Sequence, residues 1–461
     1  MSQEGPTAAR RLRFRLQRPL LPVLSERLLR ERLVSGATQT LLANTFMLAV
    51  SLGSAVLLAR ALGPDGRAAL EALTFLPRAL TPILQVGVSQ ANAYVTSQGR
   101  FNTPTLTRNT LLVAIGVGVP AAAACVPLVP VWLHQYTNGV LTLAAVFLFT
   151  IPLGILNVGL LGLILGQKRY TTFNLVRAVP PAIELVLLAA LFMADRLTVT
   201  EAALVHVSTA GLLVLAVQII VLGRPAISCA TEHLRALKTT LKYGVRCLSA
   251  DAASVANNSA DRALLVTLLS PAEFGQFVVA TRTAGLLLSL PNAIGTVLMP
   301  EAAGRTGPQA VRLTVSALIL NAAMASGLAA LLFFTIPILV PSLYGEAFAP
   351  AVVPAQVLLL GITLSGLAGI VGEGLKGMGR PARVAIADGI GGVVTAAGIM
   401  WLVPVAGLTG AAAGSAAGYA VGLIVLLVFF QRIRSAGFGR LVTTQTRTVT
   451  SLPKPGNGPS P

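Results

Sequence analysis

Long apolar stretches follow one another along most of the chain, separated by short segments that carry Gly, Pro and basic residues. A helix needs about 20 apolar residues to cross the hydrocarbon core of a bilayer, and windows of that length give twelve candidate spans. The spans cover residues 36–58, 69–94, 109–132, 139–165, 171–194, 201–223, 243–268, 273–299, 313–340, 350–375, 382–404 and 409–431. The pattern predicts an all-α integral membrane protein with about 12 transmembrane helices.

The segments outside the spans complete the predicted organisation. The chain divides into a basic N-terminal segment, a first bundle, a linker, a second bundle and a tail, at 1–35, 36–223, 224–242, 243–431 and 432–461. The N-terminal segment is an amphipathic helix on anionic lipid or a partly disordered tail, and the C-terminal tail is expected to be disordered. Arginines interrupt the first thirty residues, so no secretory signal is evident and the first span should remain in the mature protein.

The composition supports this picture and excludes several chemistries. Hydrophobic residues make up 54% of the chain and charged residues 11%, far from the roughly 25% charged residues of an average soluble domain. The 3 Cys have no paired spacing and the 3 His are scattered. We therefore expect no disulfide scaffold, zinc cluster or attached haem.

The net charge of +18 follows the predicted topology. Of the 34 Lys and Arg residues, 27 fall in the N-terminal segment, alternate loops and the tail, on one side of the membrane. The opposite loops hold Arg60, Arg67 and Arg196, and four arginines lie within or at the ends of spans. Because Lys and Arg favour the cytoplasmic side, both termini are predicted to be cytoplasmic and no nucleic-acid binding is expected.

The two halves of the chain show signs of an internal duplication. Positions in the first hairpin recur in the second half at offsets of 207 and then 204 residues. The pairs are Asn44 with Asp251, Ser51 with Asn258, Ser54 with Asp261, Pro64 with Pro271, Arg78 with Arg282, Gln85 with Ser289, and Asn92 with Thr296. Six spans give each half the same orientation. We therefore expect two six-helix bundles, related by a pseudo-two-fold axis along the membrane normal, around a central cavity.

Three helices carry a polar face that lipid would not require. On the second span, seven polar residues lie within roughly 80° of the helix circumference. They are Glu71, Thr74, Arg78, Thr81, Gln85, Ser89 and Asn92. The eighth span carries Arg282, Gly285, Ser289, Asn292 and Thr296, and the seventh carries Asp251, Ser254, Asn258 and Asp261. These helices are predicted to line the cavity.

Arg78 and Arg282 are the main candidates for substrate contact or gating. A cation at the bilayer centre costs about 2.5–3.5 kcal/mol on insertion scales, so it usually faces water or a bundle interior. The alternative for Arg282 is a structural pair with a carboxylate such as Asp251. Asp261 and Arg262 lie near the outer end of their helix, where we expect them to order the turn.

Other charged residues within spans leave more than one interpretation open. Arg177 and Glu184 are seven residues apart and are able to pair over two helical turns, across a two-proline kink. Asp388, flanked by glycines, is a candidate proton or cation site. Together with Asp251 and Glu71, it is a candidate for coupling transport or for orienting the arginines.

No residues with an evident catalytic role are found. The chain has no GxxxxGK[ST] phosphate loop, and every predicted outer loop is short. A polymerase or glycosyltransferase of the membrane is expected to carry acidic residues in a sizeable outer loop. The sequence therefore predicts a protein that is not an enzyme and needs no cofactor.

Several segments, in their order and spacing, resemble a known family. They are "LLARALGPDGRAAL" (57–70), "LILGQKRYTTFNLVRAV" (163–179), "NNSADRALLVTLLSPAEFGQFVVATR" (257–282), "LPNAIGTVLMPEAAGR" (290–305), "GEGLKGMGRPARVAI" (372–386) and "VPVAGLTGAAAGSAAGYA" (403–420). Over residues 36–431 the chain resembles the polysaccharide and lipid-linked oligosaccharide flippases of the multidrug/oligosaccharidyl-lipid/polysaccharide exporter (MOP) superfamily.

The resemblance implies a flippase that moves a lipid-linked oligosaccharide, a polyprenyl-diphosphate glycan, across the bacterial cytoplasmic membrane for surface polysaccharide synthesis. A guanidinium holds phosphate through paired donors, which suits Arg78 and Arg282 to the diphosphate. The polar residues proposed to contact the sugars are Gln85, Asn92, Ser289, Asn292 and Asn258. The expected partners are the lipid-linked oligosaccharide, membrane lipids, and a glycan polymerase and glycosyltransferases, with the flippase itself a monomer.

Two other functions remain open. Related peptidoglycan-precursor flippases use cavity arginines on the first, second and eighth helices, whereas the first span here has no charged residue and only Asn44 as a candidate. A cation-coupled multidrug exporter is the other alternative, and it should have a cavity dominated by acidic residues. The arginines favour an anionic substrate over a cationic one. A protein with this fold that transports nothing would tolerate alanine along the polar face of the second span.

Overall fold

The structure is a computed structural model, and it describes residues 20–99, 101–213, 215–216, 218–219, 230–303 and 305–450. These residues form helices joined by short turns, and no strand occurs among them. The helices of the first half are α2 (Leu20–Leu84), α3 (Val88–Ser97), α4 (Thr103–Val113), η1 (Ala114–Gly118), α5 (Val119–Cys125), η2 (Val126–Leu128), α6 (Val129–Trp132), α7 (Asn138–Leu148), α8 (Thr150–Gly166), α9 (Tyr170–Met193), α10 (Val199–His206) and η3 (Val207–Leu213). The second half contains α12 (Ala230–Leu268), α13 (Pro271–Ala284), η4 (Gly285–Leu288), α14 (Ser289–Ala303), α15 (Gly307–Tyr344), η5 (Glu346–Ala351), α16 (Val352–Gly377) and α17 (Pro381–Thr450).

The helices account for all twelve predicted spans. Eight stretches within the described residues are long and apolar enough to cross a membrane. Two of them, Leu42–Leu84 and Pro381–Arg434, each contain two helices joined at a kink. The helices α10 and η3 overlap the described part of the predicted span 201–223, and α12 covers the span 243–268. The prediction of an all-α membrane protein with about 12 spans is confirmed.

Glycine supplies the sharp turn within α2 and the one within α17. Gly63 has φ 65° and Gly407 has φ 53°, a region that residues with a side chain rarely adopt. After Gly63 the chain restarts as a helix at Pro64, whose fixed φ suits a first helical turn. These two tight turns replace the loops that the sequence analysis placed between the spans.

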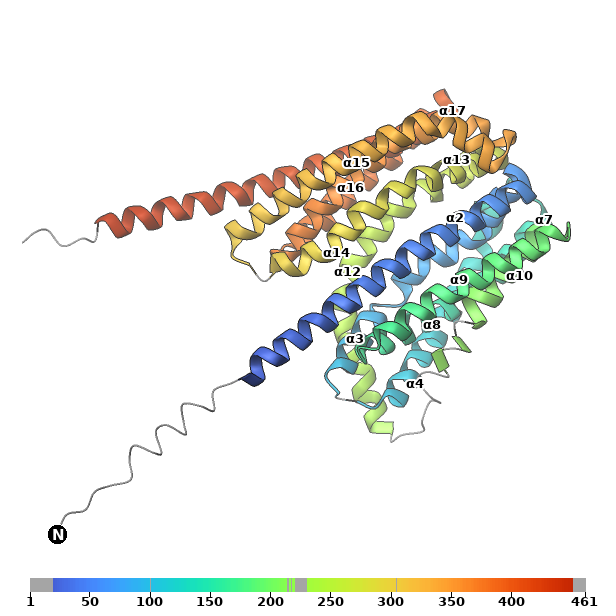
Figure 1. Ribbon diagram of the computed structural model, residues 1–461. Helices are drawn as coiled ribbons and strands as arrows, with labels where there is room; N and C mark the ends of the chain where they lie inside the picture. Colours follow the sequence, from blue (N-terminus) through green and yellow to red (C-terminus); the bar gives the residue numbers. More distant parts are fainter. Residues whose placement is uncertain are drawn as a thin grey trace, which may run out of the picture.

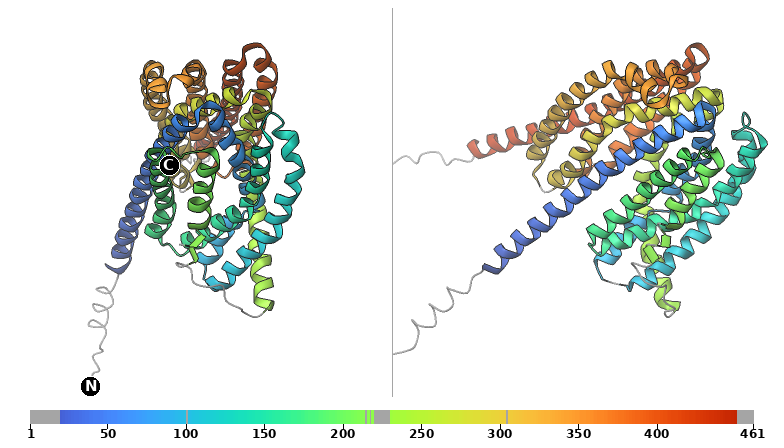
Figure 2. Two further views of the ribbon diagram at one scale, coloured as in Figure 1. Left: turned by 90° about the vertical axis from the view of Figure 1, so that its right-hand side faces the viewer. Right: turned by 45° about the vertical axis from the view of Figure 1, so that its right-hand side comes forward.

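The spans form two lobes, seen as the blue-to-green and the yellow-to-red helices in Figure 1. The N-lobe contains α2 to α10 and the C-lobe contains α13 to α17, while α12 contacts both. The end of the molecule that contains the Gly63 and Gly407 turns is called the Gly63 end. The opposite end, where the helices that lead to the two termini leave the bundle, is called the basic end. The lobes diverge from the Gly63 end toward the basic end (Figures 1 and 2).

Contacts between the lobes gather at the Gly63 end. The guanidinium of Arg60 donates to the backbone carbonyls of Leu343, at 2.7 Å, and Ser342, the last turn of α15. Side chains of the N-lobe loop after α6 and of α6 itself donate to the backbone of α12: Trp132 Nε1 to Ala263 O at 3.1 Å and Gln135 Nε2 to Thr267 O at 2.7 Å. The lobes are therefore closed against each other at this end.

Gly275 on α13 packs directly against the backbone of the N-lobe. A Cβ at this position would lie 2.0 Å from the carbonyl oxygen of Pro64, which no side chain permits. Ser270, the N-cap of α13, forms a capping box with Glu273 in the first turn of the helix. The Ser-Pro and Gly pattern of this segment thus encodes a helix start that fits against the other lobe.

The helix α12 joins the lobes at the basic end. Its first half packs on α3 and α4, where the Tyr243 and Tyr94 rings stack at 4.4 Å. The backbone of Gly244 crosses the break between α2 and α3 so closely that a Cβ on Gly87 would lie 2.3 Å from Gly244 O. Farther along, α12 packs against α17 of the C-lobe. One continuous helix therefore carries contacts to both lobes.

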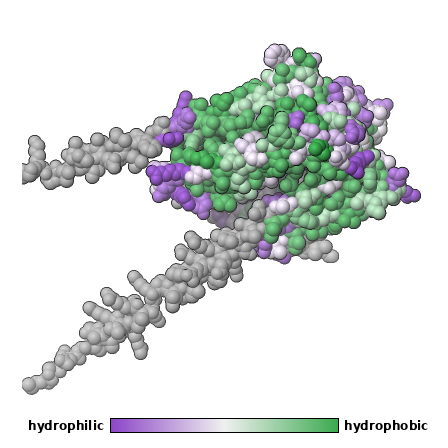
Figure 3. All heavy atoms as spheres, turned by 45° about the horizontal axis from the view of Figure 1, so that its top comes forward, coloured by the Kyte–Doolittle hydropathy of each residue, from purple (hydrophilic) through white to green (hydrophobic). Residues whose placement is uncertain are grey.

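The surface is that of a membrane protein. Figure 3 shows a broad hydrophobic face, with hydrophilic residues gathered toward the two ends of the molecule. Large apolar side chains such as Phe334, Trp401 and Val405 are more than 70% exposed. Water would oppose such exposure, whereas lipid accepts it.

The helices extend beyond the spans at both termini. The helix α2 begins at Leu20, inside the segment 1–35, and α17 continues to Thr450. The sequence analysis expected 432–461 to be a disordered tail, and the helical backbone of α17 continues into this segment, because intrahelical hydrogen bonds do not require apolar side chains. Residues 1–19 and 451–461 lie outside the described residues.

Candidate functional site

The buried carboxylate of Glu71 lies at the interface between the lobes and is surrounded by arginines. Its side chain is 1% exposed. The nearest nitrogen–oxygen distances to it are 3.4 Å for Arg67, 3.5 Å for Arg78, 3.6 Å for Arg262 and 3.9 Å for Arg282. Four cations thus share one anion within the membrane-spanning part of the protein.

Helix geometry brings these residues together from both lobes. Arg67, Glu71 and Arg78 are four and seven residues apart on α2, a spacing that puts them on one helical face. Arg262 lies near the end of α12, and Arg282 lies at the end of α13. Because α2 belongs to the N-lobe, the Glu71 carboxylate joins the two lobes electrostatically.

The cluster has an excess of positive charge. Asp261, which is 4% exposed, is the second carboxylate of the site and accepts a hydrogen bond at 2.7 Å from the backbone N–H of Arg262. Four arginines and two carboxylates leave two positive charges unbalanced. Two unit charges about 4 Å apart at an effective dielectric of 20 interact by roughly 4 kcal/mol, so this excess favours binding of an anion.

The arginines are able to engage a further ligand. Charge-assisted N–H···O bonds are typically about 2.7–2.9 Å long, whereas every arginine here is at least 3.4 Å from Glu71. The side chains of Arg78, Arg282 and Arg262 are 44%, 35% and 23% exposed, respectively. These three guanidinium groups therefore keep donors that face the interlobe space.

The arginines border two adjoining cavities, which we call together the arginine cavity. One, of about 420 Å³, lies between α2, α9 and α10 and is lined by Arg67, Glu71, Arg78 and Arg282 among others. The other, of about 370 Å³, lies toward the C-lobe. Both are lined by Ser51, Ala55 and Arg282, and the second also by Asp261, Arg262, Ser365 and Tyr419.

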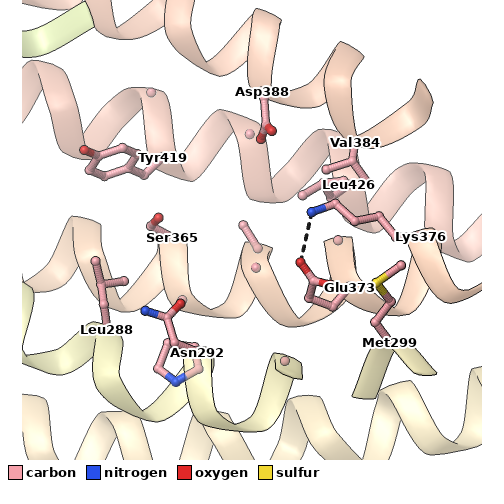
Figure 4. Close-up of a pocket in the computed structure, with 18 residues that line it drawn as sticks. Leu288, Asn292, Met299, Ser365, Glu373, Lys376, Val384, Asp388, Tyr419 and Leu426 are labelled. Carbon is pink, nitrogen blue, oxygen red and sulfur yellow. Dashed lines mark hydrogen bonds and ion pairs between the residues drawn. The ribbon is translucent and has the colours of Figure 1, made fainter. Parts of the chain in front are cut away.

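A third cavity, the C-lobe cavity, has a volume of about 620 Å³ and lies between α14, α16 and α17. Figure 4 shows Asp388 directed into it from α17, opposite Ser365 and the Glu373–Lys376 ion pair of α16, whose charged atoms are 2.9 Å apart. Asn292 of α14 also lines this cavity. It borders the arginine cavity, because Leu288, Ser365 and Tyr419 line both.

Three of the predicted site residues meet at one point. Glu71, predicted as a coupling or orienting residue, contacts both Arg78 and Arg282, the pair that the internal duplication had aligned. Arg78 also donates to the hydroxyl of Thr74 at 3.1 Å. Glu71 is thus a carboxylate that pairs with Arg282, whereas the side chain of Asp251, the partner considered from the sequence, lies outside the described residues.

Gln85 and Asn92 lie farther along the same polar stripe, among packed helices. Gln85 is 7% exposed, just before the break between α2 and α3. Asn92 is 1% exposed, and its amide donates to Thr110 Oγ1 at 2.8 Å and to Gly159 O at 2.9 Å. These contacts give the Asn92 side chain partners within the N-lobe.

The predicted residues of the C-lobe are dispersed. Asn292 and Asp388 line the C-lobe cavity. Ser289 is exposed at the start of α14, and its hydroxyl donates to Leu286 O at 2.8 Å. The side chains of Asp251 and Asn258 lie outside the described residues, although the backbone of α12 is helical at both positions.

The sequence analysis missed Arg67 and misinterpreted Arg262. Arg67 was assigned to an outer loop, but the tight turn at Gly63 places it inside the second helix, one turn before Glu71. Arg262 was expected to order a turn, yet it faces Glu71. Arg67 and Glu71 are four residues apart, a spacing that brings side chains together on a helix. A prediction with a shorter loop would therefore have included Arg67 in the site.

Arg177 and Glu184, whose pairing was one of the interpretations left open by the sequence, have other partners. Glu184 instead accepts from His206 Nδ1 at 3.0 Å, and both residues line the arginine cavity. Arg177 donates to Asn44 Oδ1 at 3.4 Å and lies over the Phe173 ring. A separation of seven residues also spans the two prolines of α9, and each partner finds a closer group on a neighbouring helix.

Solved structures share this architecture. The chain is similar to the lipid II flippase MurJ in an inward closed conformation, with a TM-score of 0.68, 12% identity, and coverage of 90% of this chain and 93% of that chain. It is similar to a multidrug resistance MATE family transporter of the MOP superfamily in its inward-facing conformation, with a TM-score of 0.67, 17% identity, and coverage of 84% and 95%. For the outward-facing conformation of a MATE family transporter the TM-score is 0.58, the identity 16%, and the coverage 88% and 96%.

The chain therefore has the fold of the MOP-superfamily transporters, as the sequence resemblance predicted. No protein-family model and no curated protein sequence matches it. At these identities the likeness is one of fold, and the substrate has to be inferred from the chain's own residues.

Proposed function

We propose that this protein is a flippase that moves a lipid-linked oligosaccharide across the bacterial cytoplasmic membrane. The observation that carries the proposal is the arrangement of Arg67, Arg78, Arg262 and Arg282 around Glu71 at the lobe interface. A cavity with excess positive charge, inside a transporter fold, favours an anionic substrate. We infer that the substrate is a polyprenyl-diphosphate glycan.

The chemistry of the headgroup fits the charge of the cluster. In a diphosphate that links a glycan to a lipid, each of the two phosphates carries a negative charge, and four arginines outnumber the carboxylates that line the arginine cavity, which are Glu71, Asp261 and Glu184. A guanidinium presents paired donors that match phosphate oxygens, and such contacts strengthen in a cavity that excludes water. The polyprenyl chain would remain in the bilayer while the headgroup crosses between the lobes.

The distribution of Lys and Arg gives the direction. If the basic end faces the cytoplasm, as the positive-inside rule indicates, the contacts at the Gly63 end close the outer side of the membrane. The arginine cavity is then accessible from the cytoplasmic leaflet, where lipid-linked glycans are assembled by glycosyltransferases. Rocking of the lobes about the interface would expose the cavity to the outer side, where a glycan polymerase acts.

Glu71 has a defined part in this cycle. In the absence of substrate, its carboxylate compensates four arginines and limits their mutual repulsion. A bound diphosphate takes over this compensation and frees Glu71 to be protonated or to change its contacts. Glu71 thereby links substrate occupancy to a cation- or voltage-coupled transition, with the protein working as a monomer.

A peptidoglycan lipid precursor is a second candidate substrate, because it also carries a diphosphate and the fold resembles a lipid II flippase. The first span of this chain lacks the cavity arginine of peptidoglycan-precursor flippases. Arg67 and Arg262 add cations to the site and so reduce this difference. Export of cationic drugs is less compatible with the site, because the positive excess would repel them.

The proposal is tested by comparing two variants at equal membrane abundance. Arg282→Ala should abolish surface-glycan export and weaken binding of polyprenyl diphosphate by the purified protein. Arg196→Ala, an exposed arginine in a loop at the Gly63 end, should retain both. Unchanged export in Arg282→Ala would contradict the proposal. Complementation of a strain depleted of its lipid II flippase distinguishes the peptidoglycan precursor from other glycans, and a drug-susceptibility panel tests the exporter alternative.

A further inference from the structure

The C-lobe cavity is a separate chamber beside the arginines. Its volume of about 620 Å³ falls within the roughly 300–1,000 Å³ of ligand pockets. It borders the arginine cavity at Ser365 and Tyr419. A headgroup whose phosphates contact Arg282 therefore has a second compartment next to it.

The two compartments have opposite electrostatic character. The charged residues that line the C-lobe cavity are Glu373, Lys376 and Asp388. Glu373 and Lys376 neutralise each other at 2.9 Å, which leaves Asp388 as the uncompensated charge of the lining. The arginine cavity has an excess of positive charge, whereas this cavity is weakly negative and repels a second anionic group.

The remaining lining suits a polyhydroxylated ligand. Asn292, Ser365 and Asp388 come from three directions, on α14, α16 and α17, and offer both donors and acceptors (Figure 4). Glycines also form the wall, at Gly295, Gly366, Gly369, Gly372, Gly418 and Gly422. At Gly369 a Cβ would meet nothing within 4 Å, so a rigid ring is able to approach the helix backbone closely at this position.

We propose that the C-lobe cavity is the glycan subsite and that it selects uncharged sugars. This inference rests on the proposed function, because the diphosphate on the arginines places the first sugars at the Ser365 and Tyr419 boundary. Neutral sugars bond to Asn292, Ser365 and Asp388 through their hydroxyls. A sugar with a carboxylate would instead face Asp388 and Glu373 without a free cation to receive it.

A cavity-filling variant separates the two parts of the site. A Cβ on Gly369 would meet nothing within 4 Å, so Gly369→Phe should fill the C-lobe cavity without a clash at its first atom. Gly327 on α15 also has open space, is exposed, and lines none of the three cavities, so Gly327→Phe is the matched control. Gly369→Leu is a smaller second variant for the case that phenylalanine prevents folding.

Binding is measured on the full-length protein in nanodiscs with three probes. The probes are polyprenyl diphosphate, the same lipid carrying a neutral trisaccharide, and the same lipid carrying a trisaccharide with one hexuronic acid. The neutral glycolipid should bind at least ten-fold more tightly than polyprenyl diphosphate. Gly369→Phe should remove this gain and change the affinity for bare polyprenyl diphosphate less than two-fold, whereas Gly327→Phe should retain the gain.

The acidic probe tests the selectivity. It should bind at least ten-fold more weakly than the neutral one, and Asp388→Asn should reduce this ratio to below three-fold. Retention of the sugar-dependent gain in Gly369→Phe and Gly369→Leu, or equal affinity for the neutral and acidic probes, would overturn the subsite. The failure of the proposed function has a different signature, since bare polyprenyl diphosphate would then bind equally to the wild type and to Arg282→Ala.

Discussion

Arg282 Nη2 of the C-lobe lies 3.9 Å from Glu71 Oε2 of the N-lobe. Arg262, also from the second half of the chain, lies 3.6 Å from the other oxygen of the same carboxylate. One acidic side chain thus holds cations from both lobes, and any movement that separates the lobes changes its environment. This relationship makes Glu71 the residue at which substrate charge and lobe position are coupled.

Replacing Glu71 by glutamine should destabilise the unliganded protein. The substitution removes the counter-charge of four arginines, and breaking a buried ion pair typically costs about 3–5 kcal/mol. We expect a lower Tm in detergent and a larger stabilisation by added polyprenyl diphosphate than in the wild type. Glu301→Gln is the control, because its pair with Arg305 is exposed and should contribute less than about 1 kcal/mol. An unaltered Tm in Glu71→Gln would show that the arginines do not depend on it.

Replacing Arg262 by glutamine distinguishes a binding role from the turn-ordering role expected from sequence. A hydrogen bond to a charged group contributes about 1.5–3 kcal/mol, so its loss should weaken binding of polyprenyl diphosphate roughly 10- to 150-fold. Binding is measured by titration of the purified protein. Lower thermal stability together with unchanged affinity would instead assign Arg262 to the turn before α13.

Adding a methyl group at Gly275 should open the Gly63 end. The new Cβ would lie 2.0 Å from Pro64 O, so α13 and α2 must separate. We expect Gly275→Ala to shift the protein toward states that are open at this end. The measurement is the distance between two spin labels at this end, one on α2 and one on α13, which should become longer. Gly327→Ala, whose Cβ has open space, is the control. Identical distance distributions for the two variants would mean that this contact does not set the closed state.

Replacing Asn92 by alanine should affect folding more than binding. Its amide donates to Thr110 and Gly159, and truncation leaves these buried acceptors with one partner fewer, at a cost of about 1–3 kcal/mol. The expected result is a lower Tm with little change in affinity for the lipid-linked glycan. A large loss of affinity at unchanged Tm would restore Asn92 to the substrate site.

The spans were predictable because the bilayer imposes their length and composition. The tight turns at Gly63 and Gly407 were not predictable, because a glycine between two apolar stretches is equally compatible with a longer loop. That difference of a few residues moved Arg67 from the surface to the centre of the site. Helical periodicity gives the angular position of a residue around its helix, whereas the depth of that residue in the membrane depends on where the helix starts.

The polar stripe on the second span illustrates the same limit. Its spacing correctly placed Glu71 and Arg78 on one face, but the same face carries Asn92 into contact with α4 and α8. Sequence periodicity cannot tell whether a polar face meets water or another helix, because both satisfy hydrogen bonds. The offset between corresponding positions in the two halves of the sequence was more informative about the site, because it paired Arg78 with Arg282. These two residues meet at Glu71.

The helix α12 acts as a mechanical strut between the lobes. It is fixed to the N-lobe where Gly244 crosses Gly87 and to the C-lobe along α17, and its backbone is helical without interruption from Ala230 to Leu268. A helix held at both ends bends when its supports rotate, and the bending stores elastic energy. We therefore expect a flexible insertion in α12 to change the energy of the transition between lobe positions without altering the site.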